Sequence, residues 1–229
     1  MPLTLVLVIA LTQGSLAPES GEVHLRNLRQ LTFGGQNAEA YFSASGKLLI
    51  FQRQGPAEQC DQMYVMGADG SGVRRVSSGR GRTTCGYFFD HDRRIFYSST
   101  EHAGAACPPR PDYSHGYVWA LYDYDIYTAG ADGSGARRLT TNPGYDAEGT
   151  LAPDGKTIVF TSLRDGDLDI YTMRVDGGGL RRLTTQLGYD GGPFFSPDGK
   201  RLVWASNRHG AVPHETNIFI ADWVEGERP

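Results

Sequence analysis

Carboxylates recur in short loops of this chain at matching positions of a repeat. Two loops share a Gly-Tyr-Asp start, at residues 144–148 and 188–192, and residues 36–39 hold a glutamate at the corresponding place. Acids that meet at one opening attract a metal cation, the amine end of a peptide or a basic protein segment. The alternative is that the aspartates only accept backbone hydrogen bonds in turns. The candidate binding residues are Glu39, Tyr145, Asp146, Glu148, Tyr189 and Asp190.

A second acidic group is Asp165, Asp167 and Asp169, which alternate with other residues in one loop. Oxygen ligands at this spacing can begin a calcium site, but the glycine and the distal glutamate of an EF-hand loop are missing. The simpler interpretation is a hairpin turn at Asp165-Gly166. We therefore expect no cofactor and keep calcium as the minor alternative.

The chain has three cysteines, Cys60, Cys85 and Cys107. The repeat register places all three on one face, so we expect a disulfide between Cys85 and either Cys60 or Cys107, as in an oxidising compartment. Reduced, buried cysteines are the alternative. A zinc site is disfavoured because no Cys-x-x-Cys pair occurs.

One stretch, residues 101–121, departs from the repeat. It combines three prolines with Tyr113, Tyr117 and Trp119, which predicts a stiff aromatic loop. Such loops on rigid scaffolds are common recognition sites, and these three aromatic residues are the expected contacts. A lid that only shields one end of the fold is the alternative.

The elements that must position these residues form a repeat marked by an Arg-Arg-Leu-Thr motif. Its copies begin at Arg29, Arg74, Arg137 and Arg181, so the intervals are 45, 63 and 44 residues. Between the motifs, β-branched and aromatic runs alternate with Gly, Asp and Pro, which indicates four strands per unit. In the third unit we expect strands at residues 148–152, 157–162, 169–173 and 180–184.

A repeat in the forties with four short strands is typical of an all-β fold, the β-propeller. We expect one domain, residues 23–229, with about four blades of four antiparallel strands. The last unit lacks its outer strand, which residues 24–32 could supply and so close the ring. The expected blades are residues 33–78, 79–141, 142–185, and 186–229 together with 24–32.

Residues 1–22 are expected to be a signal or leader segment, because an apolar run at residues 3–11 precedes small residues. The run is too short to cross a membrane, so we expect no membrane span and a periplasmic or secreted protein. The net charge of −4 argues against nucleic-acid binding, since a continuous basic surface is missing. The paired arginines are instead expected to protect outer sheet edges from pairing with other molecules.

The Pro-Asp-Gly-Lys turns at 153–156 and 197–200, the Asp-Ile-Tyr strands at Asp125 and Asp169, and the Arg-Arg-Leu-Thr ends resemble the PD-type, WD-like repeats of TolB-like β-propellers. The segments CDQMYVM, TTCGYFF and TNIFIADWV resemble a stand-alone, exported bacterial subgroup. The resemblance implies a non-catalytic scaffold that binds an envelope protein or peptide. That family usually has six blades and TolB has a further α/β domain, so this chain differs in both respects.

An enzymatic function is the alternative. A metal-dependent lactonase or esterase would use Glu39, Asp146, Glu148 and Asp190 around a divalent ion. A propeller remnant of a prolyl-oligopeptidase-type peptidase is also conceivable, although no Gly-x-Ser-x-Gly nucleophile motif occurs. The oligomeric state is left open by the sequence.

Overall fold

The computed structural model describes residues 16–114, 120–210, 215–224 and 226. The chain divides into two compact units, Met1–Gly34 and Gly35–Pro229. Most of the expected leader, residues 1–15, lies outside the described residues. In the described part of the first unit, Leu16 and Leu28 form an isolated antiparallel bridge. No helix long and apolar enough to cross a membrane occurs in the described part of the chain.

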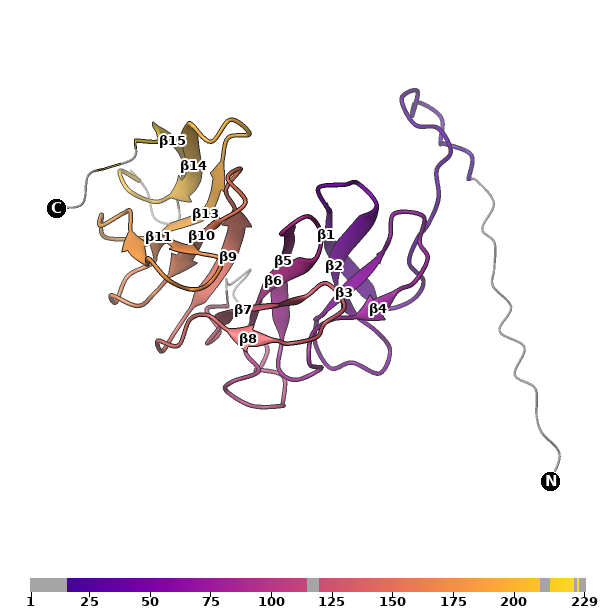
Figure 1. Ribbon diagram of the computed structural model, residues 1–229, viewed down its shortest axis with the longest axis horizontal. Helices are drawn as coiled ribbons and strands as arrows, with labels where there is room; N and C mark the ends of the chain where they lie inside the picture. The colour runs from indigo at the N-terminus through magenta and orange to yellow at the C-terminus, as the bar shows by residue number, and fades with distance from the viewer. Residues whose placement is uncertain (1–15, 115–119, 211–214, 225, 227–229) are drawn as a thin grey trace. The chain divides into compact units, whose positions relative to one another are not determined.

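The second unit is built of antiparallel sheets, which we call the first to fourth blade in chain order (Figure 1). The strands of the first two blades are β1 (Gln36–Phe42), β2 (Leu48–Gln54), β3 (Gln62–Gly67), β4 (Arg74–Arg75), β5 (Thr83–Phe89), β6 (Arg94–Ser99), β7 (Asp125–Gly130) and β8 (Arg137–Arg138). Those of the last two are β9 (Asp146–Leu151), β10 (Thr157–Ser162), β11 (Asp169–Arg174), β12 (Arg181–Arg182), β13 (Asp190–Phe195), β14 (Arg201–Ser206) and β15 (Asn217–Asp222). The expected all-β propeller repeat is confirmed.

The outer strands are shorter than the sequence indicated. Each of β4, β8 and β12 contains only the arginine pair, which lies opposite the middle of the third strand of its blade. The next residue, Leu or Val, still donates its N–H to the third strand, but the hydroxyl of the Thr or Ser after it takes the place of a main-chain acceptor. Thr184 Oγ1, for example, accepts a hydrogen bond from the Ile170 N–H at 2.9 Å.

The fourth blade differs from the expectation. In the described residues its sheet has three strands, in the order β13-β14-β15, and residues 24–32 are not among them. Leu28 pairs with Leu16 instead. The Leu16 N–H donates to the Leu28 main-chain oxygen at 2.7 Å, so this stretch has a local backbone partner.

Successive blades are held together by apolar cores that form between their facing sheets. Ile50 and Val65 of the first blade pack on Ile95 and Tyr97 of the second. Equivalent cores join the second blade to the third and the third to the fourth. Because each blade packs against the next, the innermost strands can line one common space. These strands are β1, β5, β9 and β13.

Candidate functional site

Every innermost strand carries a β-bulge at the same place. The register of each strand against its neighbour shifts once, and the residue at the shift has a left-handed backbone. Those residues are Glu39, Cys85, Glu148 and Gly192, with φ of 50°, 53°, 56° and 58°. A positive φ is strained for residues other than glycine, and bulges often redirect side chains toward functional sites. Three of the four blades keep a non-glycine residue in this conformation.

All four bulge residues line one cavity of about 610 Å³. Its wall draws on each of the four blades and contains seven tyrosines, three acids (Glu39, Asp61 and Glu148) and two arginines (Arg82 and Arg110). The tyrosines in it are Tyr41, Tyr87, Tyr113, Tyr122, Tyr124, Tyr145 and Tyr189. A concave site with many aromatic faces and a few polar groups is the usual form of a binding pocket.

Tyr124 contributes a buried ring to this wall. The residue is 5% exposed, and its ring makes edge contacts with the rings of Tyr122 and Tyr145. Burial raises the pKa of this phenol, whereas the nearby Arg82 guanidinium acts to lower it. A tyrosine hydroxyl on the wall of a cavity can donate or accept a hydrogen bond.

Glu148 is fixed in place by hydrogen bonds from its own blade and from the neighbouring one. Its Oε2 accepts hydrogen bonds from Thr161 Oγ1 at 2.6 Å and from the Gly192 N–H at 2.7 Å. The second carboxylate oxygen takes no part in these bonds. Glu39 lies on the exposed strand β1 and lines the same cavity. Two carboxylates among tyrosine rings are suited to a cationic group, which gains from both charge and π-faces.

Cys85, on the innermost strand between those of the two acids, is half-buried. Burial, followed by the charge of Glu39, raises the pKa of its thiol to about 12. The thiol is therefore neutral and poorly nucleophilic at physiological pH. Beside it, Tyr41 and Tyr87 stack with ring centroids 4.6 Å apart, which joins the first two blades at the cavity wall.

The observed disulfide corrects the expected pairing. Cys60 bonds Cys107, and Cys85 is free. Cys60 and Cys107 lie in the connections between the second and third strands of adjacent blades, with Cα atoms 5.9 Å apart. Cys85 is held apart because its bulge turns it toward the cavity.

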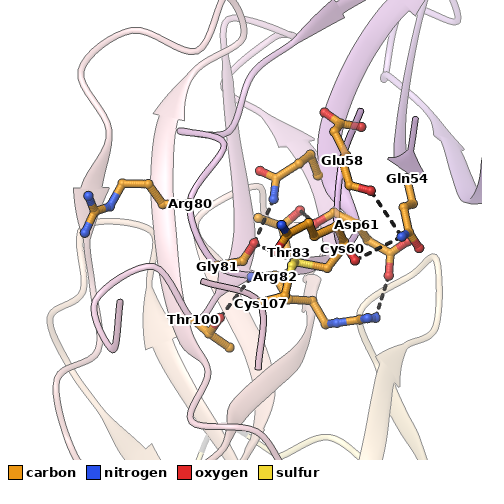
Figure 2. The surroundings of a disulfide bond; sticks show 12 residues. Gln54, Glu58, Cys60, Asp61, Arg80, Gly81, Arg82, Thr83, Thr100 and Cys107 are labelled. Carbon is orange, nitrogen blue, oxygen red and sulfur yellow. Dashed lines mark hydrogen bonds and ion pairs between the residues drawn. A yellow bond between two sulfur atoms is a disulfide. The ribbon is translucent and has the colours of Figure 1, made fainter. Parts of the chain in front are cut away.

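Figure 2 shows Asp61 and Arg82 beside this disulfide, joined by an ion pair of 2.6 Å. The bond anchors the long second-blade loop to the first blade. Arg110, Pro111 and Tyr113 of that loop line the cavity. Tyr113 thus lies at the expected site, while Tyr117 and Trp119 lie outside the described residues.

Two of the expected acids do not belong to this site. Asp146 and Asp190 are almost completely buried, and each pairs with an arginine of its own blade. Asp146 Oδ2 lies 3.0 Å from Arg164 Nη2, and Asp190 Oδ2 lies 2.5 Å from Arg208 Nη2. The bulge explains the difference: it turns Glu148, two residues after Asp146, toward the cavity, while the aspartates face the arginines. Tyr145 and Tyr189 do line the cavity.

The three aspartates of residues 165–169 engage different partners. Asp165 accepts a hydrogen bond from the Tyr171 hydroxyl at 2.5 Å, and Asp167 accepts one from the Gly188 N–H at 2.7 Å. Asp169 is buried and pairs with Arg182. No group of three metal-ligating side chains occurs in the described part of the chain. These contacts give each aspartate a structural partner.

The sequence reasoning missed Tyr41, Cys85, Tyr87 and Tyr124. A signal was present, because Glu39, Cys85, Glu148 and Gly192 are separated by 46, 63 and 44 residues, close to the intervals between the arginine motifs. The repeat register alone would have placed Cys85 among the cavity residues. Tyr122 and Tyr124 had no such signal, since they end the irregular loop.

The fold and this shared cavity define a β-propeller whose inner strands face a central cavity. The family model for the tricorn protease N-terminal beta propeller domain matches residues 106–227, and the chain belongs to that family. No curated protein matches the chain significantly.

Among solved structures, a putative TolB from Agrobacterium tumefaciens superposes with a TM-score of 0.60 at 21% identity, covering 79% of this chain and 59% of that one. TolB from Acinetobacter baumannii gives 0.58 at 18% identity, covering 82% and 41%. An oligogalacturonate lyase in complex with manganese gives 0.52 at 20% identity, covering 83% and 49%. The fold is therefore that of the TolB-like propellers, and the chain spans about half the length of these neighbours.

Proposed function

We propose that this chain is a non-catalytic, TolB-like scaffold that binds a protein or peptide segment in its central cavity, in the periplasm or outside the cell. The observation that carries the proposal is the bulge shared by the four inner strands. It directs Glu39 and Glu148 into a cavity whose wall contains seven tyrosines. The segment it suits carries an ammonium group, from a lysine or a peptide amino terminus.

The strain at Glu39 supports a role in binding rather than in folding. Its φ of 50° would cost less with glycine, as at Gly192 in the fourth blade. A residue that is suboptimal for stability and faces a cavity is typical of a functional position. Cell-envelope location is supported by the disulfide, which persists in oxidising compartments, and by the TolB neighbours.

The test measures calorimetric binding of a lysine hexapeptide and of its fully acetylated form, which lacks ammonium groups. We expect the cationic peptide to bind more tightly, and Glu39→Gln or Glu148→Gln to weaken it about ten-fold, or about 1.4 kcal/mol, each. Asp176→Asn is the matched control, because it removes the same charge from an exposed turn. Equal weakening by Asp176→Asn, or equal binding of both peptides, would refute the proposal.

Glu39→Gly adds a second readout. It removes both the charge and the strain, so we expect weaker binding together with an increase in unfolding free energy of about 0.5–1 kcal/mol. Glu39→Gln should lose binding without that gain. If the glycine variant is destabilised, Glu39 has a structural role that this interpretation does not include.

A metal-dependent hydrolase is less well supported. Of the four acids that it needs, Asp146 and Asp190 are committed to buried ion pairs with Arg164 and Arg208. The lyase neighbour binds manganese, but its likeness to this chain extends to the fold alone. Metal analysis of the purified protein, with and without Glu148→Gln, distinguishes this function from the scaffold.

A further inference from the structure

The central cavity contains opposite charges that do not pair with each other. Glu39 and Glu148 line it together with Arg82 and Arg110. Within the described residues neither glutamate forms an ion pair, and Arg110 forms none. Opposite charges that share a cavity without pairing create a field that suits a ligand carrying both charges.

The acids and the arginines lie at different levels along the inner strands. Glu39 and Glu148 occupy the bulges of β1 and β9, and Cys85 occupies the bulge of β5. Arg82 comes three residues before Cys85, directly ahead of β5. Because a strand advances about 3.3 Å per residue, Arg82 lies up to about 10 Å from the level of the bulges. The cavity therefore has one level of acids and one of arginines.

Arg82 is held in place with unused hydrogen-bonding capacity. Its main-chain N–H donates to Thr100 Oγ1 at 2.9 Å, and its Nη1 donates to Asp61 Oδ2 at 2.6 Å. Its guanidinium carbon lies 5.7 Å from the centre of the Tyr122 ring. Nε has no hydrogen-bond partner among the described residues. A guanidinium has five N–H groups in a planar fork, so this fixed side chain can donate further bonds to an anion.

Tyr122 brings Arg110 into the same part of the wall. The Tyr122 hydroxyl donates to the main-chain oxygen of Pro109 at 2.9 Å, so the residue before Arg110 is fixed to the ring that Arg82 contacts. Arg110 itself is exposed and lines the cavity. Because Asp61 already neutralises Arg82, Arg110 gives this level of the cavity its net positive charge.

Building on the proposed function, we infer that Arg82 and Arg110 form a second subsite, which binds a carboxylate of the same peptide whose ammonium group lies between Glu39 and Glu148. An extended peptide covers about 10 Å in three residues, which matches the separation of the two levels. The ligand class is therefore a peptide with a lysine and a carboxylate about three residues apart. The carboxylate comes from an acidic side chain or from the peptide's own carboxyl terminus.

The experiment measures calorimetric binding of three short peptides. They are acetyl-Lys-Gly-Gly-Glu-amide, its uncharged counterpart acetyl-Lys-Gly-Gly-Gln-amide, and the latter with a free carboxyl terminus. Relative to the uncharged counterpart, we expect a carboxylate to tighten binding by the wild type about ten-fold. The peptide that shows this gain identifies the source of the carboxylate. Equal affinities for all three peptides would overturn the second subsite.

Two variants show whether the gain comes from this subsite. Arg110→Gln should reduce it to near zero, and the fold should be kept because the side chain is exposed. Arg80→Gln is the matched control, since it removes the same charge from an exposed residue that does not line the cavity. Figure 2 shows Arg80 pointing away from Arg82 and Asp61. An equal loss of the gain in both variants would indicate a general charge effect and overturn the inference.

A third variant separates this subsite from the ammonium site. If the proposed function holds, Glu39→Gln should weaken the binding of all three peptides. Weakening by Glu39→Gln without any gain from a carboxylate would overturn the second subsite and leave the ammonium site standing. A gain that Arg110→Gln removes, together with no effect of Glu39→Gln, would support the carboxylate subsite and refute the proposed ammonium site.

Discussion

Arg74 donates a hydrogen bond from Nη2 to the main-chain oxygen of Ala131, 2.9 Å away in the next blade. Arg137 repeats the contact one blade further on, donating to the main-chain oxygen of Asp176 at 3.1 Å. The first arginine of the motif thus links neighbouring blades, and the second one, as in Arg138 and Arg182, pairs with a buried aspartate. These contacts give both arginines of the motif a structural reason to recur in successive blades.

Removal of the linking arginines should lower stability modestly and additively. We expect Arg74→Ala and Arg137→Ala each to reduce the unfolding free energy by about 0.5–1 kcal/mol, because each loses one exposed hydrogen bond. The sites lie in different blade junctions, so the double variant should give the sum. Urea unfolding measures the two single variants and the double variant. A loss of unfolding free energy near zero in the double variant would contradict a role of these arginines in linking the blades.

Arg164→Met should be far more damaging, because it leaves the buried carboxylate of Asp146 without its partner. We expect a loss of about 3 kcal/mol in unfolding free energy. The exposed Arg93, which pairs with Asp90 on the surface, provides the control, and Arg93→Met should change it by less than about 1 kcal/mol. Thermal unfolding of both variants checks the contrast. Equal losses of unfolding free energy in the two variants would contradict the idea that the buried carboxylate of Asp146 depends on Arg164.

The Cys60–Cys107 disulfide should stabilise the domain through the 47-residue separation that it closes. Replacing both cysteines by serine should cost about 2–4 kcal/mol, since the unfolded chain gains freedom. The lysine peptide should also bind more weakly, because the anchored loop supplies part of the cavity wall. Dithiothreitol should reproduce both effects in the wild type and leave the serine variant unchanged.

Cys85 should resist thiol reagents in the folded protein. Its thiol has a pKa raised to about 12, chiefly by burial, so little thiolate forms at pH 8. Labelling with dithiobis-nitrobenzoate should be slow in buffer and rapid in guanidinium chloride, with one thiol per chain. Rapid labelling of the folded protein would show that the cavity admits the reagent and activates the thiol.

The hairpin turns should make stability depend on acid. Hydrogen bonds from Ser134 lower the pKa of Asp132, and those from Ser196 and the Lys200 N–H lower the pKa of Asp198. A carboxyl whose pKa is depressed on folding stabilises the protein above its unfolded value, here 3.8, and that contribution is lost as the pH falls below it.

Thermal midpoints measured between pH 6 and pH 3 test this dependence. The double variant Asp132→Asn with Asp198→Asn keeps an acceptor oxygen at each turn but cannot titrate, so its midpoint should decline less steeply than that of the wild type. Identical slopes for the two proteins would show that these turns do not contribute to acid sensitivity.

The sequence by itself determined the repeat and most of its strands. The expected strand at residues 157–162 coincides with β10, and the alternation of apolar and polar residues had the right period because each strand buries one face on the next blade. Asp146 and Asp190 were misplaced because a local motif does not reveal a bulge, which requires one strand to hold an extra residue against its partner.

Only the tertiary structure decided which side chains share a space. Glu39, Cys85 and Glu148 come from three blades, and the bulges and inter-blade packing bring them to one cavity; Cys107 reaches Cys60 because two loops of adjacent blades meet. The same holds for Ile218 and Ile220, which the periodicity marks as apolar but not as exposed. Periodic patterns follow from local backbone geometry, whereas these relationships follow from how the blades pack.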